Sequence, residues 1–468
     1  MRGRPGAAAT LLFALTAALA GCSHPAGPAP ARSASSAADS PAAASASPSP
    51  GPALTTRDWP TYHRDAARTG LAPGEPPAGR LAVAWSARLD GAVYGQPLAV
   101  GSLVIAATEN DSVYGLERTT GAVRWRAHVG TPVPLRRLQC GDIGPLGITG
   151  TMAYDPATGV AYAVAETSGY HHTLVGVSVT TGRVLVRRDI PTPDGHPASD
   201  QQRAALALAA GRVYVAFGGL YGDCGPYRGS VVGVPVSGRG PLVSYVVPTE
   251  REGGIWAAGG PVTGPDGTLY VSAGNAASTG GRYDGSDSVT ALTPGLRRAG
   301  LFAPAIWGSD NAGDLDLGSS SPALLGNGTM LAVGKRGIGY LLSSSRLGGV
   351  GGQRAQRAIC SAYGGMAVSG TTVYVPCESG GLAAFDTASR TVRWRGPAAA
   401  AGSPVLGGGA VWVPDYNAGV LYELAPATGA VRQQLRLPAA LPHFASPSLS
   451  GGLALLGTRR GVVAVRGV

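Results

Sequence analysis

A repeated four-strand pattern is the feature that most constrains the fold of this chain. The segments LDGAVYGQPLAVGSLVIAATENDSVYGLERTTGAVRWRAHVG (89–130) and AAGSPVLGGGAVWVPDYNAGVLYELAPATGAVRQQLRL (400–437) follow the same order. Each has a small-residue start, a short apolar strand, a Gly-rich turn, a second strand, a polar turn, a third strand, then TTG or ATG and a fourth strand. Units of four short strands at a spacing of roughly 40 to 60 residues are typical of β-propellers, so the pattern predicts that fold.

Pairs of second and third strands occur eight times along the chain. Besides the two units above, the pairs are GVAYAVAE with TLVGVSV, RVYVAFGG with SVVGVPV, TLYVSAGN with SVTALTP, MLAVGKRG with YLLSSS, TVYVPCES with GLAAFDT, and LALLGTRR with VVAVRGV. A β-helix or a pair of β-sandwiches would not produce strand quartets at this period. We therefore predict an all-β fold, an eight-bladed propeller of four-stranded antiparallel blades, over residues 57–468.

The last unit has only three strands before Val468, so its fourth strand has to come from elsewhere. The segment RLAVAWSARL (80–89) precedes the first complete unit and can supply it. In this segment Trp85 takes the position that Trp125 holds in AVRWRAHVG and Trp394 holds in TVRWRGP. Closing the ring with an N-terminal strand also removes a sheet edge that would invite aggregation.

The first residues read as an export signal followed by an anchor. Residues 1–21 combine two arginines with an apolar run of about 14 residues, too short to span a bilayer but right for a secretory signal peptide. The sequence LAGC ending at Cys22 resembles the lipobox of bacterial lipoproteins, in which the cysteine is acylated; an ordinary signal peptide with a chance cysteine is the alternative. Residues 22–56, rich in Ala, Ser and Pro, predict a disordered tether. We expect an extracytoplasmic protein that is bound to the outer face of the cell membrane through lipidated Cys22.

The charge of the chain excludes one class of partner. Basic residues exceed acidic ones by 37 − 27 = 10, but they are scattered, and no basic block with interleaved aromatic residues predicts nucleic-acid binding. Outside the cytoplasm the positive charge suits anionic lipid or a cell-wall polymer, or it belongs to a merely solvated surface. We expect a monomer.

The repeats resemble a known superfamily. The TTGAVRW pattern, the AVYGQP and SVYGL strands and the opening DWPTYHRDAARTG (58–70) are similar to the pyrroloquinoline quinone (PQQ) propeller repeats. That group contains the eight-bladed quinoprotein alcohol dehydrogenases and a non-catalytic lipoprotein of outer-membrane β-barrel assembly. The resemblance covers residues 58–468 and predicts the fold more strongly than it predicts an activity.

Chain reversal assigns the unusual residues to one face. In an up-and-down blade with strands A to D, strand A starts on the face where strand B ends, so B–C turns and D–A links share a face. Lys335, the only lysine of the chain, falls in a B–C turn, and the other unusual residues fall in B–C turns or D–A links of adjacent blades. This rule gathers six residues on one face: Asp223, Trp256, Asn275, Asp314, Asp316 and Lys335.

The resemblance implies a role for each of four of these residues. Quinoprotein dehydrogenases hold PQQ at one end of the propeller against an aromatic ring, with Ca²⁺ on oxygen ligands at its carbonyl. Asp223 in YGDCGPYRG and Asn275 in SAGN match the positions of the metal ligands. Trp256 in GGIWAAGG matches the stacking ring, and Lys335 in GKRGIGYLL matches the basic contact to the quinone.

The catalytic base is the fifth role, and Asp314 or Asp316 in WGSDNAGDLDLG can fill it. Two features depart from the family: no pair of adjacent cysteines is present, and Asp223 is shorter than the glutamate usual at its position.

Two hypotheses about the function follow. The first is a quinoprotein that binds PQQ and Ca²⁺ and oxidises an alcohol or sugar. The second is a non-catalytic propeller that binds an envelope protein or a cell-wall polymer.

Apart from Cys22, the chain has four cysteines, and an even number in an exported protein predicts disulfides. Cys140 lies in the D–A link into blade 2 and Cys224 in the B–C segment of blade 3. Cys360 precedes blade 6 and Cys377 ends its second strand. We therefore predict the pairs Cys140–Cys224 and Cys360–Cys377, with a structural rather than a redox role.

Overall fold

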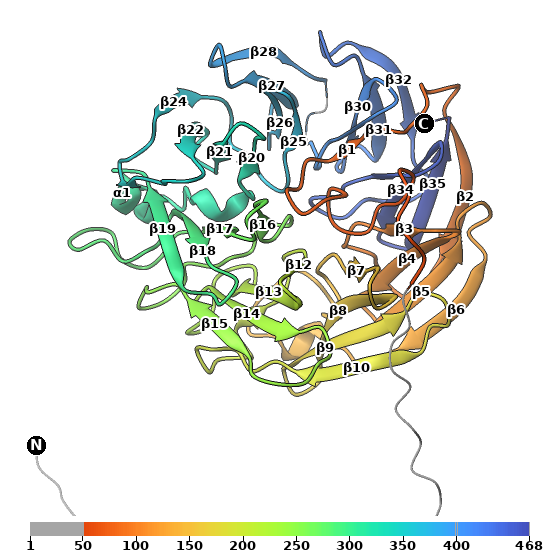
Figure 1. The fold of residues 1–468 in the computed structure, drawn as a ribbon, viewed down its shortest axis with the longest axis horizontal. Helices are drawn as coiled ribbons and strands as arrows, with labels where there is room; N and C mark the ends of the chain where they lie inside the picture. The colour runs from red at the N-terminus through yellow and green to blue at the C-terminus, as the bar shows by residue number, and fades with distance from the viewer. Residues whose placement is uncertain (1–50, 398, 400, 468) are drawn as a thin grey trace, which may run out of the picture. The chain divides into compact units, whose positions relative to one another are not determined.

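The computed structural model describes residues 51–397, 399 and 401–467, and these residues form eight antiparallel sheets arranged radially as a ring (Figure 1). The prediction of an all-β, eight-bladed propeller is thereby confirmed. The predicted signal peptide, Cys22 and the predicted tether up to residue 50 lie outside the described residues. No helix in the described part of the chain is long and apolar enough to cross a bilayer.

Each blade has four strands, which we denote A to D from the centre of the ring outward. Blade 1 contains β3 (Leu98–Val100), β4 (Leu103–Thr108), β5 (Ser112–Glu117) and β6 (Val123–His128). Blade 2 contains β7 (Ala153–Asp155), β8 (Val160–Thr167), β9 (His171–Ser178) and β10 (Val184–Asp189). Blade 3 contains β12 (Ala207–Ala209), β13 (Arg212–Gly219), β14 (Ser230–Pro235) and β15 (Val243–Val246). Blade 4 contains β16 (Val262–Thr263), β17 (Leu269–Ala273), β18 (Ser288–Leu292) and β19 (Arg298–Ala303).

The other half of the ring repeats this order. Blade 5 contains β20 (Ala323–Leu324), β21 (Thr329–Val333), β22 (Ile338–Ser343) and β24 (Ala355–Ala358). Blade 6 contains β25 (Ala367–Ser369), β26 (Thr372–Pro376), β27 (Leu382–Asp386) and β28 (Thr391–Arg395). Blade 7 contains β29 (Val405–Gly407), β30 (Ala410–Asp415), β31 (Val420–Leu424) and β32 (Val431–Arg436). Blade 8 contains β33 (Ser448–Leu449), β34 (Leu453–Thr458), β35 (Gly461–Arg466) and β2 (Ala82–Arg88).

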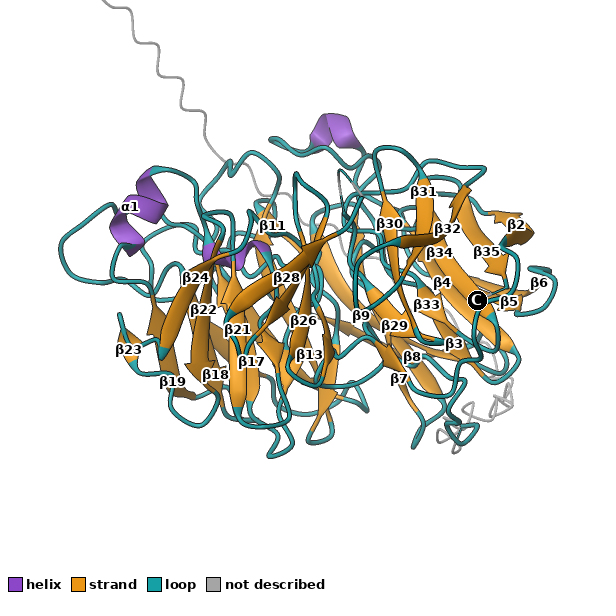
Figure 2. Ribbon diagram, turned by 90° about the horizontal axis from the view of Figure 1, so that it is seen from above, coloured by secondary structure: helices purple, strands orange, loops and turns teal. Residues whose placement is uncertain are grey.

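The ring closes as the sequence predicts. Strand β2, which precedes blade 1 in the chain, pairs antiparallel with β35 from Ala82 opposite Arg466 to Arg88 opposite Gly461. Three short strands extend other blades: β1 (Leu71–Ala72) pairs with β29, β11 (Asp200–Gln201) with β13, and β23 (Gly349–Val350) with β19. The helical segments are α1 (Trp307–Ala312), η1 (Leu135–Arg137) and η2 (Leu317–Ser319), all in D–A links, and α1 and η1 lie on the same side of the ring in Figure 2.

The core lies between neighbouring sheets. Apolar side chains of adjacent blades form successive buried clusters, as expected when the faces of sheets pack together. The repeated tryptophan and glycine of the sequence pattern have a physical reason here. Trp125 at the outer edge of blade 1 donates its Nε1–H to the carbonyl oxygen of Val179 in blade 2, at 2.9 Å. Its ring covers Gly182 (φ +71°), where a Cβ would lie 2.8 Å from the indole.

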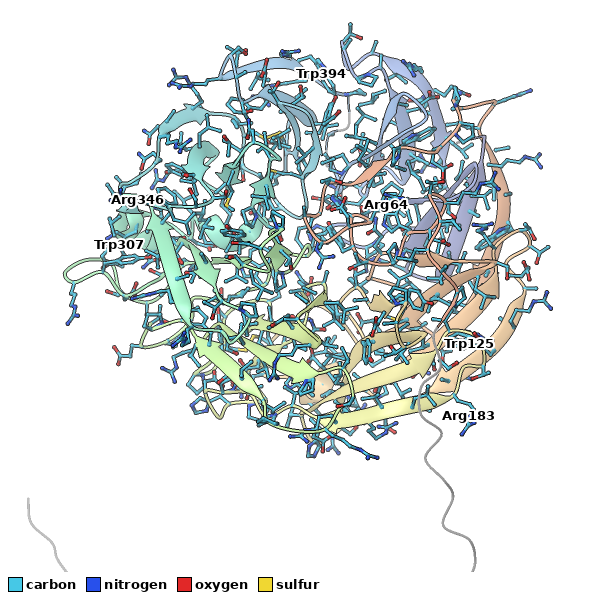
Figure 3. All side chains as sticks on the ribbon, in the orientation of Figure 1. Arg64, Trp125, Arg183, Trp307, Arg346 and Trp394 are labelled. Atoms are coloured by element: carbon cyan, nitrogen blue, oxygen red, sulfur yellow. A yellow bond between two sulfur atoms is a disulfide. The ribbon has the colours of Figure 1, made fainter. Side chains whose placement is uncertain are left out.

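The same arrangement occurs at two further blade junctions. Trp85 donates to the carbonyl of Arg118 and Trp394 to that of Pro426, each at 2.9 Å. The TTG or ATG turn of one blade is therefore the docking point for the tryptophan of the blade before it. Trp125 and Trp394 are labelled at the outer edge of the ring in Figure 3.

A segment before the first blade lies inside the ring. Residues 58–72 carry the DWPTYHRDAARTG motif, and they contact the inner strands of several blades (Figure 1). Trp59 pairs with Ala99 of blade 1. His63 is fully buried and contacts the carbonyl oxygen of Met366 in blade 6 and the hydroxyl of Ser446 at blade 8. This segment therefore fastens opposite sides of the ring to one another, a role that the sequence did not predict.

Candidate active site

All six residues predicted to share a face line one cavity of about 490 Å³. Asp223, Asn275 and Lys335 follow the B strands of blades 3, 4 and 5. Trp256 lies in the link that precedes blade 4, and both aspartates lie in the link that precedes blade 5. The strand-reversal rule thus placed these side chains correctly, while their chemical roles remain predictions.

Lys335 forms the centre of the polar half of the cavity. Its Nζ donates to Oδ1 of Asp314 at 2.6 Å and lies 2.8 Å from Oδ2 of Asp316. The same ammonium lies 5.7 Å from the ring centroid of Trp256, within cation–π range. Burial would lower the pKa of Lys335, but Asp316 and Asp314 outweigh burial and raise that pKa. Lys335 is therefore a fixed cation that holds two carboxylates.

Asp316 and Asp314 differ in environment although both pair with Lys335. The side chain of Asp314 is 66% exposed, whereas that of Asp316 is 1% exposed. Burial raises the pKa of Asp316 to about 6, against the opposing effect of Lys335. Its Oδ1 is buried and has no hydrogen-bond partner among the described residues. One oxygen of this carboxylate is therefore unpaired in the wall of the cavity.

A glycine lets the backbone approach this oxygen and the indole closely. A Cβ at Gly274 would lie 3.3 Å from both Oδ1 of Asp316 and Nε1 of Trp256. The next residue, Asn275, accepts a hydrogen bond from Gly253 through its backbone carbonyl, at 2.8 Å. No hydrogen bond of its side-chain amide is found among the described residues, so the amide is available to a ligand.

Asp223 is held by its neighbours. It has a positive φ of 50° in the loop after β13, and its Oδ1 accepts a hydrogen bond from the hydroxyl of Tyr227 at 2.6 Å. Asp223 and Asn275 offer hard oxygen atoms of the kind that bind Ca²⁺. Among the described residues, no group of three or more His, Cys, Asp or Glu side chains is arranged for a metal ion. A metal here would therefore need the amide and further ligands besides protein carboxylates.

The aromatic half of the cavity was not predicted. Tyr363, in the link before blade 6, stacks on Phe444, in the link before blade 8, with ring centroids 6.1 Å apart. Trp256 lies 6.2 Å from Tyr363 and 6.1 Å from Phe444. The strand-reversal rule assigns these links to the cavity face, but it gives no reason to choose these rings from the other aromatic residues there.

Arg203 is a second cation that the sequence analysis did not select. It lines the cavity from the link before blade 3, and its guanidinium lies 5.5 Å from the ring centroid of Phe444. Its contact with Asp142 is long, at 3.8 Å, so the pair is weak. Nothing in the sequence around Arg203 separates it from the many other arginines.

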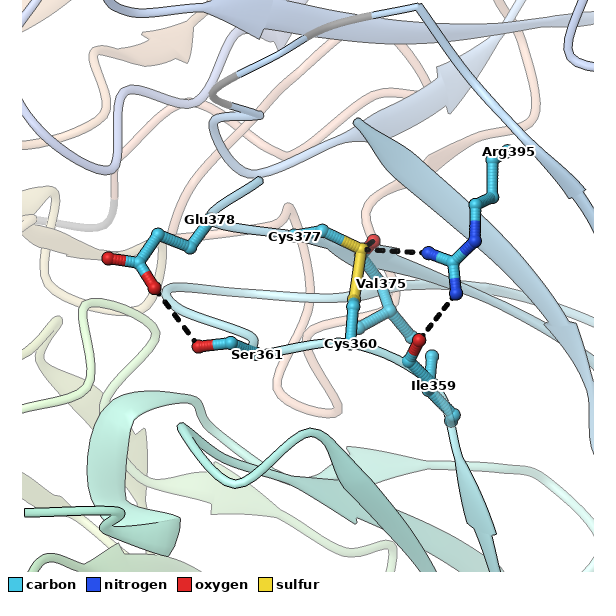
Figure 4. Close-up of a disulfide and its surroundings, with 7 residues drawn as sticks. All are labelled: Ile359, Cys360, Ser361, Val375, Cys377, Glu378 and Arg395. Atoms are coloured by element: carbon cyan, nitrogen blue, oxygen red, sulfur yellow. Dashed lines mark hydrogen bonds between the residues drawn. A yellow bond between two sulfur atoms is a disulfide. The ribbon is translucent and has the colours of Figure 1, made fainter. Parts of the chain in front are cut away.

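Both predicted disulfides are present. Cys140–Cys224 joins the D–A link before blade 2 to the loop of Asp223. Cys360–Cys377 joins the D–A link before blade 6 to the end of strand β26 in that blade. Figure 4 shows that Glu378 directly follows the second disulfide, and its carboxylate accepts a hydrogen bond from Ser361 at 3.2 Å. Because Asp223 and Glu378 both line the cavity, each disulfide steadies one part of its wall.

The fold and this cavity define an eight-bladed propeller of PQQ-like repeats with a polar, partly aromatic pocket on the face of its B–C turns. The chain belongs to the family whose model is described as outer membrane protein assembly factor BamB. That model matches residues 80–271 and 319–467, which is well over half of the chain. No curated protein sequence matches the chain.

Similar solved structures include quinohemoprotein alcohol dehydrogenases and a BamB protein. Quinohemoprotein alcohol dehydrogenase ADHIIG from Pseudomonas putida HK5 has a TM-score of 0.71 at 14% identity, over 89% of this chain and 82% of that one. Quinohemoprotein alcohol dehydrogenase from Comamonas testosteroni gives 0.68 at 15%, over 88% and 80%. BamB from Moraxella catarrhalis gives 0.61 at 16%, over 83% of this chain and all of that one. At these identities the likeness establishes the fold alone.

Proposed function

We propose that the cavity binds PQQ together with Ca²⁺ and that the protein oxidises an alcohol or a sugar outside the cytoplasm. One observation carries the proposal. A lone lysine bridges two aspartates beside an indole, and an unpaired amide and a further carboxylate line the same cavity. The solved quinohemoprotein alcohol dehydrogenases of the same fold support this choice of cofactor and reaction.

The side chains of the cavity fit the two groups in kind. Trp256 would stack on the planar quinone, Lys335 would donate to it, and Asp223 and Asn275 would bind Ca²⁺. The unpaired Oδ1 of Asp316, next to Gly274 and the indole of Trp256, adds a proton acceptor to this set. When bound, PQQ would accept two electrons from the substrate, and Ca²⁺ would act as a Lewis acid.

Asp316 is the better of the two candidate bases. A general base works best when its pKa lies near the working pH, and the pKa of Asp316 is about 6. Its Oδ1 would accept the hydroxyl proton of the substrate, while Lys335 holds Oδ2 and fixes the orientation of the carboxylate. Asp314 is mostly exposed to solvent and would serve to position Lys335.

Titration of the purified protein with PQQ and Ca²⁺ tests the proposal. Binding is followed by absorbance and turnover by dye-linked alcohol oxidation. We expect Lys335→Ala and Asn275→Ala to weaken binding at least tenfold, since each removes a contact worth about 1.5 to 3 kcal/mol. Asn417→Ala is the matched control, because Asn417 is an exposed asparagine of the B–C turn in blade 7. Absence of PQQ binding by the wild-type protein would refute the proposal.

A second candidate function is a non-catalytic scaffold that binds another envelope protein. The match to the BamB family model favours it, and so does the full coverage of the BamB chain by this fold. This candidate predicts no PQQ binding. It also predicts that a partner protein, identified by cross-linking in intact cells, contacts the B–C turns and D–A links.

We also propose that the chain is exported and anchored through acylated Cys22. The apolar run and the LAGC sequence support this proposal. Metabolic labelling with a fatty acid, followed by detergent phase separation, tests it. Cys22→Ser should lose the label and move to the aqueous phase, and an unlabelled wild-type protein would contradict the proposal.

A further inference from the structure

The two faces of the ring carry opposite charge. The B–C turns and D–A links, which form the cavity face, contain 15 acidic and 10 basic residues. On the opposite face lie the eight A–B turns and the seven C–D turns whose two strands are consecutive in the chain. These turns contain seven arginines and a single acidic residue, Asp266. The cavity face is therefore net acidic and the opposite face net basic, and the outer D strands between them carry eleven further arginines and one acidic residue.

The arginines of the opposite face follow the blades around the ring. Each C–D turn of blades 1 to 6 supplies at least one: Arg118, Arg183, Arg239, Arg297, Arg346 and Arg390. Five of the six are exposed, and Arg118 is partly buried. None forms a salt bridge with a described residue, whereas most arginines that form salt bridges in the structure lie in D strands or on the cavity face. Figure 3 labels Arg183 and Arg346 at well-separated places on the ring.

This charge is arranged for a flat anionic surface. It is spread around six blades instead of following one groove, and none of the fifteen turns contains an aromatic residue that could stack on a base or a sugar. Long D–A links with helical segments project on the cavity face, and short turns form the other face (Figure 2). A broad, shallow basic face with little stacking capacity suits the phosphate groups of an anionic bilayer.

The described chain also starts on this face. The backbone N–H of Gly51 donates to the carbonyl of Pro156 in the A–B turn of blade 2, at 3.0 Å. The hydroxyl of Tyr154 donates to the carbonyl of Pro52 at 3.3 Å. Arg57 then follows as an exposed cation close to the A–B turn of blade 8, where a Cβ at Gly451 would lie 3.8 Å from its Cδ. The described chain therefore begins on the face that carries the arginines of the C–D turns.

We propose that the face of the A–B and C–D turns docks on an anionic phospholipid surface, so that the cavity opens away from the membrane. The attraction is electrostatic and adds to any anchor at Cys22. It does not depend on whether the cavity binds PQQ. Each arginine close to an anionic bilayer contributes roughly fivefold in partition, so six arginines suffice for stable docking at low ionic strength.

Two quadruple variants of equal charge test the proposal, both in the full chain carrying Cys22→Ser so that acylation is absent. The docking variant replaces four arginines of the opposite face with glutamine: Arg183, Arg239, Arg297 and Arg346. The control variant replaces four exposed arginines of the cavity face with glutamine: Arg136, Arg137, Arg282 and Arg459. Side chains of neither set form a hydrogen bond or salt bridge with a described residue, so both variants should fold, which circular dichroism verifies.

Sedimentation with vesicles of phosphatidylcholine, with and without phosphatidylglycerol, measures docking. We expect the parent protein, which carries only Cys22→Ser, to bind the phosphatidylglycerol vesicles in a salt-sensitive manner. The docking variant should bind on the order of a hundredfold more weakly than the parent, and the control variant should bind within about threefold of it. Equal losses in both variants would overturn the proposal. So would tight binding to a soluble poly(glycerol phosphate) without binding to the vesicles, because the surface would then serve a polymer.

Discussion

Replacement of Lys335 by methionine should destabilise the protein at alkaline pH but hardly at acidic pH. The substitution keeps the length of the side chain and removes the ammonium whose Nζ lies 2.8 Å from Oδ2 of Asp316. Asp316 is fully buried, and its other oxygen has no partner among the described residues. Without Lys335 this carboxylate has no cation beside it, so its pKa should rise well above the wild-type value of about 6.

The size of the effect follows from the pKa of this one group. In the wild type, the pKa of Asp316 is raised from 3.8 to about 6, so ionisation in the folded state costs about 3 kcal/mol above pH 6. In the variant, Asp316 should still be protonated at pH 8, which corresponds to a cost of about 6 kcal/mol. The difference at pH 8 is about 3 kcal/mol. At pH 5 Asp316 is largely protonated in both proteins, and the difference nearly disappears.

The sign follows from linkage. Because the folded-state pKa of Asp316 lies above its unfolded value, its stability contribution is full below about pH 4 and is lost as the pH rises. In the wild type this loss is complete a little above pH 6, whereas in the variant it continues to higher pH. Urea denaturation at pH 5 and pH 8 measures both free energies of unfolding.

Two controls separate charge from packing. The double variant Lys335→Met/Asp316→Asn has no buried charge and should recover to within about 1 kcal/mol of the wild type at pH 8. Asp314→Asn removes the exposed partner and should cost less than 1 kcal/mol. A penalty for Lys335→Met that is equal at both pH values, or a double variant no more stable than the single one, would refute the reasoning.

Three further predictions concern the ring itself. Burial raises the pKa of Glu109 and of Asp111 to about 8, so the melting temperature should fall as the pH rises from 5 to 8, and Asp111→Asn should flatten that profile; a melting temperature that rises over this range would contradict the assignment. Cys360→Ser with Cys377→Ser opens a loop of 17 residues and should lower the free energy of unfolding in urea by about 3 kcal/mol, and an unchanged midpoint would show that the loop needs no crosslink. Deletion of strand β2 should abolish cooperative thermal unfolding and cause aggregation, because β35 then becomes an unpaired edge; a soluble, cooperatively melting deletion protein would argue against ring closure as the source of stability.

The repeat predicts the fold well because the same contact between neighbouring blades recurs at three junctions of the ring. Trp125 needs a glycine under its ring, and Gly182 in the next unit provides it, so the motif records the contact between blades. The missing fourth strand of the last unit, together with Trp85 in the segment before the first unit, identified the strand that closes the ring. The strand-reversal rule uses only the direction of the chain, and it was enough to predict that Lys335 and Asn275 lie on the same face.

The rest of the site depends on information that strand order does not contain. Tyr221 and Tyr363 both line the cavity, yet Tyr221 is 68% exposed, whereas Tyr363 is partly buried and stacks on Phe444. The path of each loop decides that difference. The bridge from Lys335 to both aspartates could not be predicted from the sequence either, because the sequence left Asp314 and Asp316 as equivalent choices. The segment around His63 resembles the family, but its position inside the ring follows from contacts with several blades at once.

The pairing of β2 with β35 means that the ring can close only late in the synthesis of the chain. A polypeptide made from its N-terminus presents β2 several hundred residues before β35 exists, so β2 must wait for its partner. During that interval blades 3 to 5 can already form, since their strands are consecutive in the chain. The polar wall of the pocket can therefore form before the ring closes, whereas Tyr363 and Phe444 join it only with the later blades. Strand β2 must be protected from mispairing until β35 has been made.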